Sequence, residues 1–148
     1  MLINPMISDI ARHAHKGFGY FILLLVVSQF LLALFGAGTK PKMARILAVF
    51  QLLTVRVLGP LIILAGCALW WTLREVLPPN TWWIWLTFLL WGPVEVSSKR
   101  MVSPSVLVVI EGGEARGTLI KATLIQLLCV TAAFGLMHAN NMSWAGVL

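Results

Sequence analysis

The residues of this sequence most able to do chemistry are charged and amide side chains placed inside long apolar runs. Arg56 lies near the middle of the apolar run 49–71, and Glu95 follows the Gly92-Pro93 step of the next run. An arginine at the centre of a bilayer costs about 2.5–3.5 kcal/mol on insertion scales, so it is expected to face protein or water rather than lipid. Counted in helical rise, five polar residues fall at similar depth and predict an intramembrane polar layer: Arg56, Glu95, Gln29, Lys121 and Gln126.

Two roles are open for this layer. The runs that carry Arg56 and Glu95 are joined by a short turn, so they are expected to be antiparallel neighbours whose two charges form an ion pair. Alternatively, Glu95 pairs with Lys99, one helical turn further along the same segment. Either pair would be structural, whereas a functional layer would form a polar pocket or a proton path, because ionisable groups within membranes often serve function.

The three histidines form the second group with chemical potential. His13 and His15 precede the first apolar run, and His138 ends the last one. His13 and His15 are two positions apart on a helix and point to different faces, so at most one of them can join His138. Histidines from two helices can hold haem, and similar imidazoles with Met137 or Met142 can hold copper. The alternative is that all three are interfacial side chains that meet headgroups or water.

The elements that must position these residues are membrane helices. The chain has 148 residues, of which 59% are hydrophobic and 11% charged, against about 25% charged in a soluble domain. We therefore expect a single transmembrane domain over 1–148, an all-α, integral membrane, antiparallel four-helix bundle of up-down-up-down order. The expected spans are about 17–36, 46–72, 81–96 and 118–138, joined by turns and by an irregular cytoplasmic loop over 97–117.

The prolines and the 97–117 segment refine this prediction. Pro60 and Pro93 are expected to kink spans two and three, because proline cannot donate to the carbonyl four residues back. The apolar stretch 106–110 is too short to cross a bilayer. It is compatible with an interfacial strand or helix, a re-entrant dip, or a continuation of span three beyond Pro104.

The distribution of charge predicts the orientation. The side that holds both termini carries three basic residues, and the other side carries seven: Arg12, Lys16 and Arg74 against Lys40, Lys42, Arg45, Lys99, Arg100, Arg116 and Lys121. The positive-inside rule then predicts a bacterial-type inner (plasma) membrane protein with both termini on the non-cytoplasmic side. An aromatic belt is expected at the interface on the side of the termini, formed by Trp70, Trp71, Trp82, Trp83 and Trp85.

Several function classes are disfavoured. The sequence has no nucleotide-binding, GxSxG, HExxH or CxxC motif, and its five acidic residues leave little room for a carboxylate-based hydrolase. Its basic residues are scattered over loops and never alternate with aromatic ones, so nucleic-acid binding is not expected. Cys67 and Cys129 lie in apolar runs and are interpreted as small hydrophobic side chains.

Part of the pattern resembles the small bacterial membrane proteins of the copper-resistance-D-like and HemJ-type protoporphyrinogen oxidase group. The points of likeness are a histidine that opens span one (His13 or His15), the Arg56-Val-Leu-Gly-Pro60 stretch followed by Gly66, and the tryptophan-rich start of span three. The likeness covers about half of the chain. It implies a four-to-five-helix fold, haem or copper as cofactor, and membrane redox chemistry.

Two functions remain from different classes. The absent motifs, the small size and the one-sided tryptophans favour a non-catalytic accessory or scaffold subunit of a membrane complex, packed in the lipid bilayer against other membrane subunits or copies of itself. The alternative is a haem- or copper-linked membrane redox protein that uses His15 or His13 together with His138.

Overall fold

The computed structural model describes residues 5–73 and 82–144 and is helical through nearly all of them. Consecutive elements join end to end into four rods. The rods are α1 (Pro5–Leu32) with η1 (Ala33–Ala37); α2 (Pro41–Leu52), η2 (Leu53–Leu58) and α3 (Gly59–Leu73); α4 (Trp82–Ser97), η3 (Ser98–Val102) and α5 (Ser103–Ile110); and α6 (Arg116–Trp144). The elements η1, η2 and η3 are single π-helical turns within or at the end of a rod.

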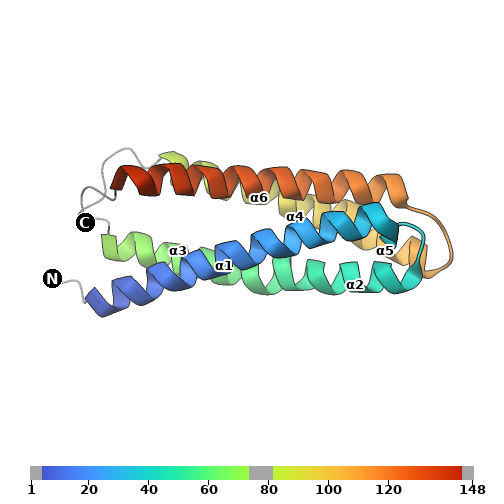
Figure 1. Ribbon diagram of the computed structural model, residues 1–148, viewed down its shortest axis with the longest axis horizontal. Helices are drawn as coiled ribbons and strands as arrows, with labels where there is room; N and C mark the ends of the chain where they lie inside the picture. The colour runs from blue at the N-terminus through green and yellow to red at the C-terminus, as the bar shows by residue number, and fades with distance from the viewer. Residues whose placement is uncertain (1–4, 74–81, 145–148) are drawn as a thin grey trace.

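Consecutive rods run antiparallel, as Figure 1 shows. α1 packs against α3 and α6, α4 packs against α6, and α5 packs against α2, so the rods close into a four-membered ring. The turns 38–40 and 111–115 lie together at one end of the bundle, here called the turn end. The described ends of the chain lie at the other end, here called the terminal end (Figure 1).

The all-helical prediction is confirmed for the described residues. Three of the helices are long and apolar enough to cross a membrane: Arg12–Ala37, Pro41–Trp71 and Arg116–Ala139. Large aliphatic side chains cover their outer surfaces, among them Leu24, Leu64 and Leu128, each at least 60% exposed. An outer surface of this kind suits a hydrocarbon surrounding far better than water.

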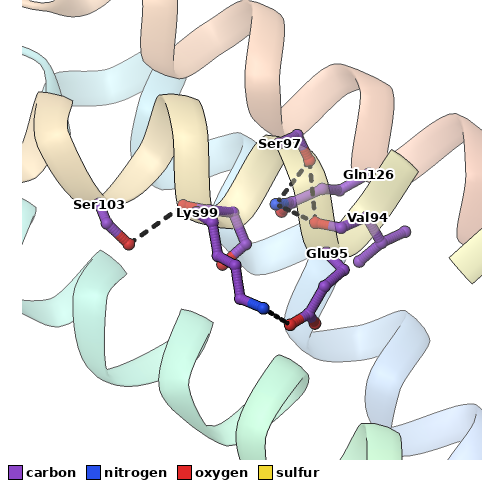
Figure 2. Close-up of polar contacts among 7 residues, drawn as sticks. Val94, Glu95, Ser97, Lys99, Ser103 and Gln126 are labelled. Carbon is purple, nitrogen blue, oxygen red and sulfur yellow. Dashed lines mark hydrogen bonds and ion pairs between the residues drawn. The ribbon is translucent and has the colours of Figure 1, made fainter. Parts of the chain in front are cut away.

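The expected loop over 97–117 is wrong for most of its length. The third rod continues from Ser97 through η3 and α5 to Ile110, and only 111–115 forms a turn. A continuation of span three beyond Pro104, one of the three alternatives, is therefore what the structure has. Pro104 comes just after the π turn η3 and does not stop the rod. The hydrogen bonds of this π turn span five residues. Both the N–H and the Oγ of Ser103 donate to the Ser98 carbonyl, the latter at 3.0 Å (Figure 2).

The same arrangement precedes Pro60 in the second rod. The N–H of Gly59 donates to the Thr54 carbonyl, five residues back, which is the hydrogen bond of a π turn. A proline in a regular α-helix would leave a carbonyl unpaired and would clash with it, and a wider turn relieves that clash. Pro93, by contrast, lies within α4 itself.

The rods are longer than the expected spans. α1 begins at Pro5, so the lead-in before residue 17 runs directly into the first rod, and α6 extends past 138 to Trp144. The expected turn over 73–80, apart from Leu73, and the last four residues of the tail fall outside the described residues.

Two apolar clusters form the core, one in each half of the bundle. The turn-end cluster consists of Ala33, Ala37, Ala44, Leu47, Val102, Val106, Val109, Leu119 and Ala122. The terminal-end cluster consists of Ile22, Leu25, Val26, Val55, Leu58, Val94 and Val130. On every rod a few residues separate the two clusters, and these residues include polar side chains.

Candidate functional site

A layer of buried amide and hydroxyl groups lies between the two apolar clusters. Gln29 of α1 is fully buried, and its Nε2 donates to Thr54 Oγ1 at 2.7 Å and to the Phe50 carbonyl at 3.3 Å. Thr54 in turn donates to the same Phe50 carbonyl at 2.8 Å. The first and second rods are therefore tied together by neutral polar groups at this level.

A second amide clamp joins α6 to α4. Gln126, 1% exposed, donates from Nε2 to Ser97 Oγ at 3.1 Å and to the Val94 carbonyl at 3.5 Å, as Figure 2 shows. Ser97 Oγ also donates to the Val94 carbonyl at 3.0 Å. In each of these two pairs of rods, the side-chain amide of one glutamine donates to a hydroxyl group of the other rod.

Gln51 of α2 belongs to the same layer and is not matched in this way. It is 5% exposed, and neither its Nε2 nor its Oε1 has a hydrogen-bond partner among the described residues. Sequence reasoning missed Gln51, Thr54 and Ser97. A signal was present, because Gln51 and Thr54 are the polar residues at helical spacing between the buried Leu47 and Leu58.

The charged members of the predicted layer lie outside the bundle core. Arg56 and Lys121 are exposed, whereas Gln29 and Gln126 are buried. Glu95 pairs with Lys99, with 2.7 Å between Oε1 and Nζ (Figure 2). The expected Arg56–Glu95 ion pair is not formed, and the alternative Glu95–Lys99 pair is. It is favoured because it joins neighbouring turns of one helix.

The second region of interest is a cavity of about 540 Å³ in the terminal half of the bundle. Both α3 and α4 line it, and neither helix packs mainly against the other, since α3 contacts mainly α1 and α4 contacts mainly α6. All four rods line it, and large aromatic side chains form much of its wall: Trp70, Trp83, Trp85, Phe88, Trp91 and Phe134. Its volume lies within the range of about 300–1,000 Å³ that is typical of ligand pockets.

The polarity of the cavity changes along its length. Arg12, His15 and Lys16 line it at the terminal end, whereas Ile22, Val94 and Val130 line it at the deepest level, next to the terminal-end cluster. Arg12 and Ile22 are ten residues apart on one helix, which is about 15 Å of helical rise. The cavity is therefore an elongated apolar pocket with basic groups at one end.

His15 is the predicted histidine that faces this cavity. Its Nδ1 lies 3.2 Å from the Ile62 carbonyl of α3, and this contact links α1 to α3. Gly66 makes room for the ring, because a Cβ at that position would lie 3.1 Å from His15 Cε1.

The other two histidines lie on the surface of the bundle. His13 and His138 are exposed, and the His138 ring stacks on Phe134 with 6.5 Å between centroids. No group of three or more His, Cys, Asp or Glu side chains gathers where it could hold a metal ion within residues 5–73 and 82–144. The expected pairing of His15 or His13 with His138 at a haem or copper stays a prediction.

Comparison of this chain with protein-family models, with curated proteins and with solved structures finds no match in any of the three.

Proposed function

We propose that this protein is a non-catalytic accessory subunit of a membrane complex, and that it docks on its partner through charged groups at the middle of its second and third rods. The observation that carries the proposal is the exposure of Arg56 at the centre of a candidate membrane span.

Arg56 is equally far from both ends of its span. The candidate span Pro41–Trp71 has 31 residues, so Arg56 lies about 22 Å of helical rise from either end. It has neither a hydrogen bond nor an ion pair with any side chain in the described part of the chain. Left against lipid, it would cost about 2.5–3.5 kcal/mol, and a carboxylate supplied by a partner helix would remove that cost.

The third rod adds to this charged surface. Glu95, Lys99 and Arg100 lie near the middle of the 82–110 rod, and Lys99 is 55% exposed. The second and third rods are neighbours in the bundle. Together they present three cations, one of them neutralised by Glu95.

The excess of positive charge identifies the kind of partner. A second copy of this chain would bring the same cationic surface, and like charges at low dielectric repel strongly. A different membrane protein with one or more acidic residues within a transmembrane helix would be complementary. We therefore favour a hetero-complex over a homo-oligomer.

The proposed orientation in the membrane rests on a different set of basic residues. Lys40, Lys42, Arg45, Arg116 and Lys121 are exposed at the turn end. Under the positive-inside rule this end belongs in the cytoplasm of a bacterial-type cell, with both termini on the other side of the inner membrane.

The test is co-purification from native membranes. Tagged wild-type protein and the Arg56→Leu variant are extracted in mild detergent, and the proteins that copurify are quantified by mass spectrometry. We expect one or more membrane proteins to accompany the wild type and to be lost from Arg56→Leu, while Arg56→Lys retains them in part.

Arg45→Leu is the matched control, because Arg45 is exposed on the same rod but close to its end. We expect it to keep the partner. A wild-type protein that purifies alone, or partners that are retained equally by Arg56→Leu, would contradict the proposal.

A further inference from the structure

The geometry points to a binding site for one anionic phospholipid in the cavity of the terminal half, with an acyl chain inside the cavity and the phosphate at Arg12 and Lys16. This inference is independent of the proposed docking of a partner, since it uses other residues at another level of the bundle. Three observations carry it: the length of the cavity, its polarity and its opening between two helices.

The length of the cavity matches one leaflet. It extends over about 15 Å of helical rise, from Arg12 to Ile22, and the hydrocarbon core of a bilayer is about 30 Å thick. It starts at the terminal end of the bundle and stops at about its middle. A lipid of the leaflet on that side could place its tail in the cavity without leaving its own depth in the membrane.

The charge distribution matches an amphiphile with a negative head. Arg12 and Lys16 line the cavity at its terminal end, and Lys16 is exposed. Asp9, one turn before Arg12 and two turns before Lys16, forms no ion pair with either. Two basic side chains that are not neutralised can bind a phosphate oxygen by charge-assisted hydrogen bonds. The deeper wall offers aromatic and aliphatic contacts.

The opening allows entry from the membrane. α3 and α4 have few contacts with each other, and residues of both helices line the cavity. On the opposite side, α1 is held to α3 by His15 at the Ile62 carbonyl and to α6 by the edge-to-face contact of Tyr20 with Phe134, at 5.1 Å between centroids. The α3–α4 side is therefore the less tightly closed one, and we assign the lateral entrance for lipid to it.

The test uses the tryptophans that line the cavity as reporters. The protein is reconstituted in phosphatidylcholine vesicles that contain a small, fixed mole fraction of phospholipid with brominated acyl chains, either phosphatidylglycerol or phosphatidylcholine. Bromine quenches tryptophan on contact. We expect brominated phosphatidylglycerol to quench more strongly than brominated phosphatidylcholine, because it is retained at Trp83, Trp85 and Trp91.

Matched variants separate the cavity from the outer surface. Ala133 lines the cavity, whereas its neighbour Ala132 is exposed and does not. Ala133→Leu is expected to abolish the excess quenching by phosphatidylglycerol, and Ala132→Leu to leave it intact. Arg12→Gln with Lys16→Gln should abolish the excess as well, whereas Lys40→Gln with Lys42→Gln, at the turn end, should not.

Three results would overturn the inference. The first is equal quenching by the two brominated lipids in the wild type. The second is an excess that survives in Ala133→Leu, which would place the bound lipid on the outer surface. The third is a purified protein with a Soret band that is lost in His15→Ala, which would assign the cavity to haem. Circular dichroism of each variant confirms that the helices are retained.

Discussion

The two halves of the bundle are built from different side chains, and they pack differently as a result. In the turn half the core is made of alanine, valine and leucine, with Ala33, Ala37, Ala44 and Ala122 at zero exposure. In the terminal half the buried cluster is made of isoleucine, leucine and valine, and tryptophan and phenylalanine line a cavity of about 540 Å³ beside it. Small residues let helix backbones approach closely, whereas large rings hold them apart.

The glycines show the same contrast. At the turn end, Gly38 touches backbone: an added Cβ would lie 2.3 Å from Arg116 Cα. In the terminal half, Gly59 touches a ring: an added Cβ would lie 2.4 Å from Trp91 Cζ2, and Trp91 borders the cavity. At Gly38, in the turn half, the neighbouring atoms belong to the backbone and cannot move away. At Gly59, in the terminal half, the neighbour is a side chain with space beside it.

The sharpest way to test this contrast is one substitution made in each half of the same helix. Ala122→Leu adds volume to the filled turn-end cluster and is expected to cost about 1–3 kcal/mol or more, with a clear fall in the melting temperature in detergent. Ala133→Leu adds the same volume next to the cavity, so we expect it to leave the melting temperature unchanged or to raise it. Equal losses in the two variants would mean that the halves are packed alike.

A smaller effect is expected from adding a methyl group at each glycine. Gly38→Ala should destabilise the protein more than Gly59→Ala, because the Arg116 backbone cannot yield whereas the Trp91 ring can shift toward the cavity. We expect losses within about 1–3 kcal/mol, the larger at Gly38. Gly92→Ala is the control, because nothing lies within 4 Å of its Cβ position. Thermal melts in the same detergent measure all three.

The boundary between the halves gives a third prediction. Gln51→Leu replaces a buried amide without a described hydrogen-bond partner and is expected to raise stability by up to about 1–3 kcal/mol, the cost of an unsatisfied polar group. Gln126→Leu removes the bonds to Ser97 and Val94 and is expected to lower it, by about 0.6 kcal/mol for a typical interhelical bond in a membrane. A loss in both variants would show that Gln51 has a partner of its own.

The smallest effects are expected on the outer surface. Glu95→Gln breaks an ion pair with Lys99 that is about half exposed, so the change should stay within about 0.2–1 kcal/mol. Arg56→Leu and Glu95→Gln should act additively, because the two residues share no bond. A coupling energy above about 0.5 kcal/mol in the double-variant cycle would restore the Arg56–Glu95 pair predicted from the sequence.

The rods and one of the contacts could be predicted from sequence, because local pattern determines them. Apolar runs of sufficient length predict the helices, and the spacing of Glu95 and Lys99 suffices for their ion pair. Pro104 was less informative: a continuation of the rod beyond it was one of three possibilities, because the sequence does not show that a π turn precedes this proline. Whether a π turn forms depends on the tertiary contacts around it, so local sequence does not reveal it.

The candidate sites were harder to predict, because they depend on how far apart helices stand. The sequence placed Gln29 and Gln126 in one layer with Arg56, yet helical rise gives depth and not direction, so buried and exposed members could not be separated. Trp83 and Trp85 were expected in an interfacial belt, and they also line a cavity. That cavity lies among four rods whose α3 and α4 segments contact each other little, and no local pattern encodes this packing.

The π turns have a consequence for how the length of this chain can vary. A π turn contains one residue more than an α turn, so it behaves as a single-residue insertion held inside a helix. Deleting one residue from η3 would turn the π turn into a regular α turn and leave the faces of α4 and α5 unchanged. Val106 and Val109 would then stay in the turn-end cluster. The same deletion within regular α-helix would rotate everything beyond it by about 100°, so the π turns are the places where this chain can lose a residue without repacking its core.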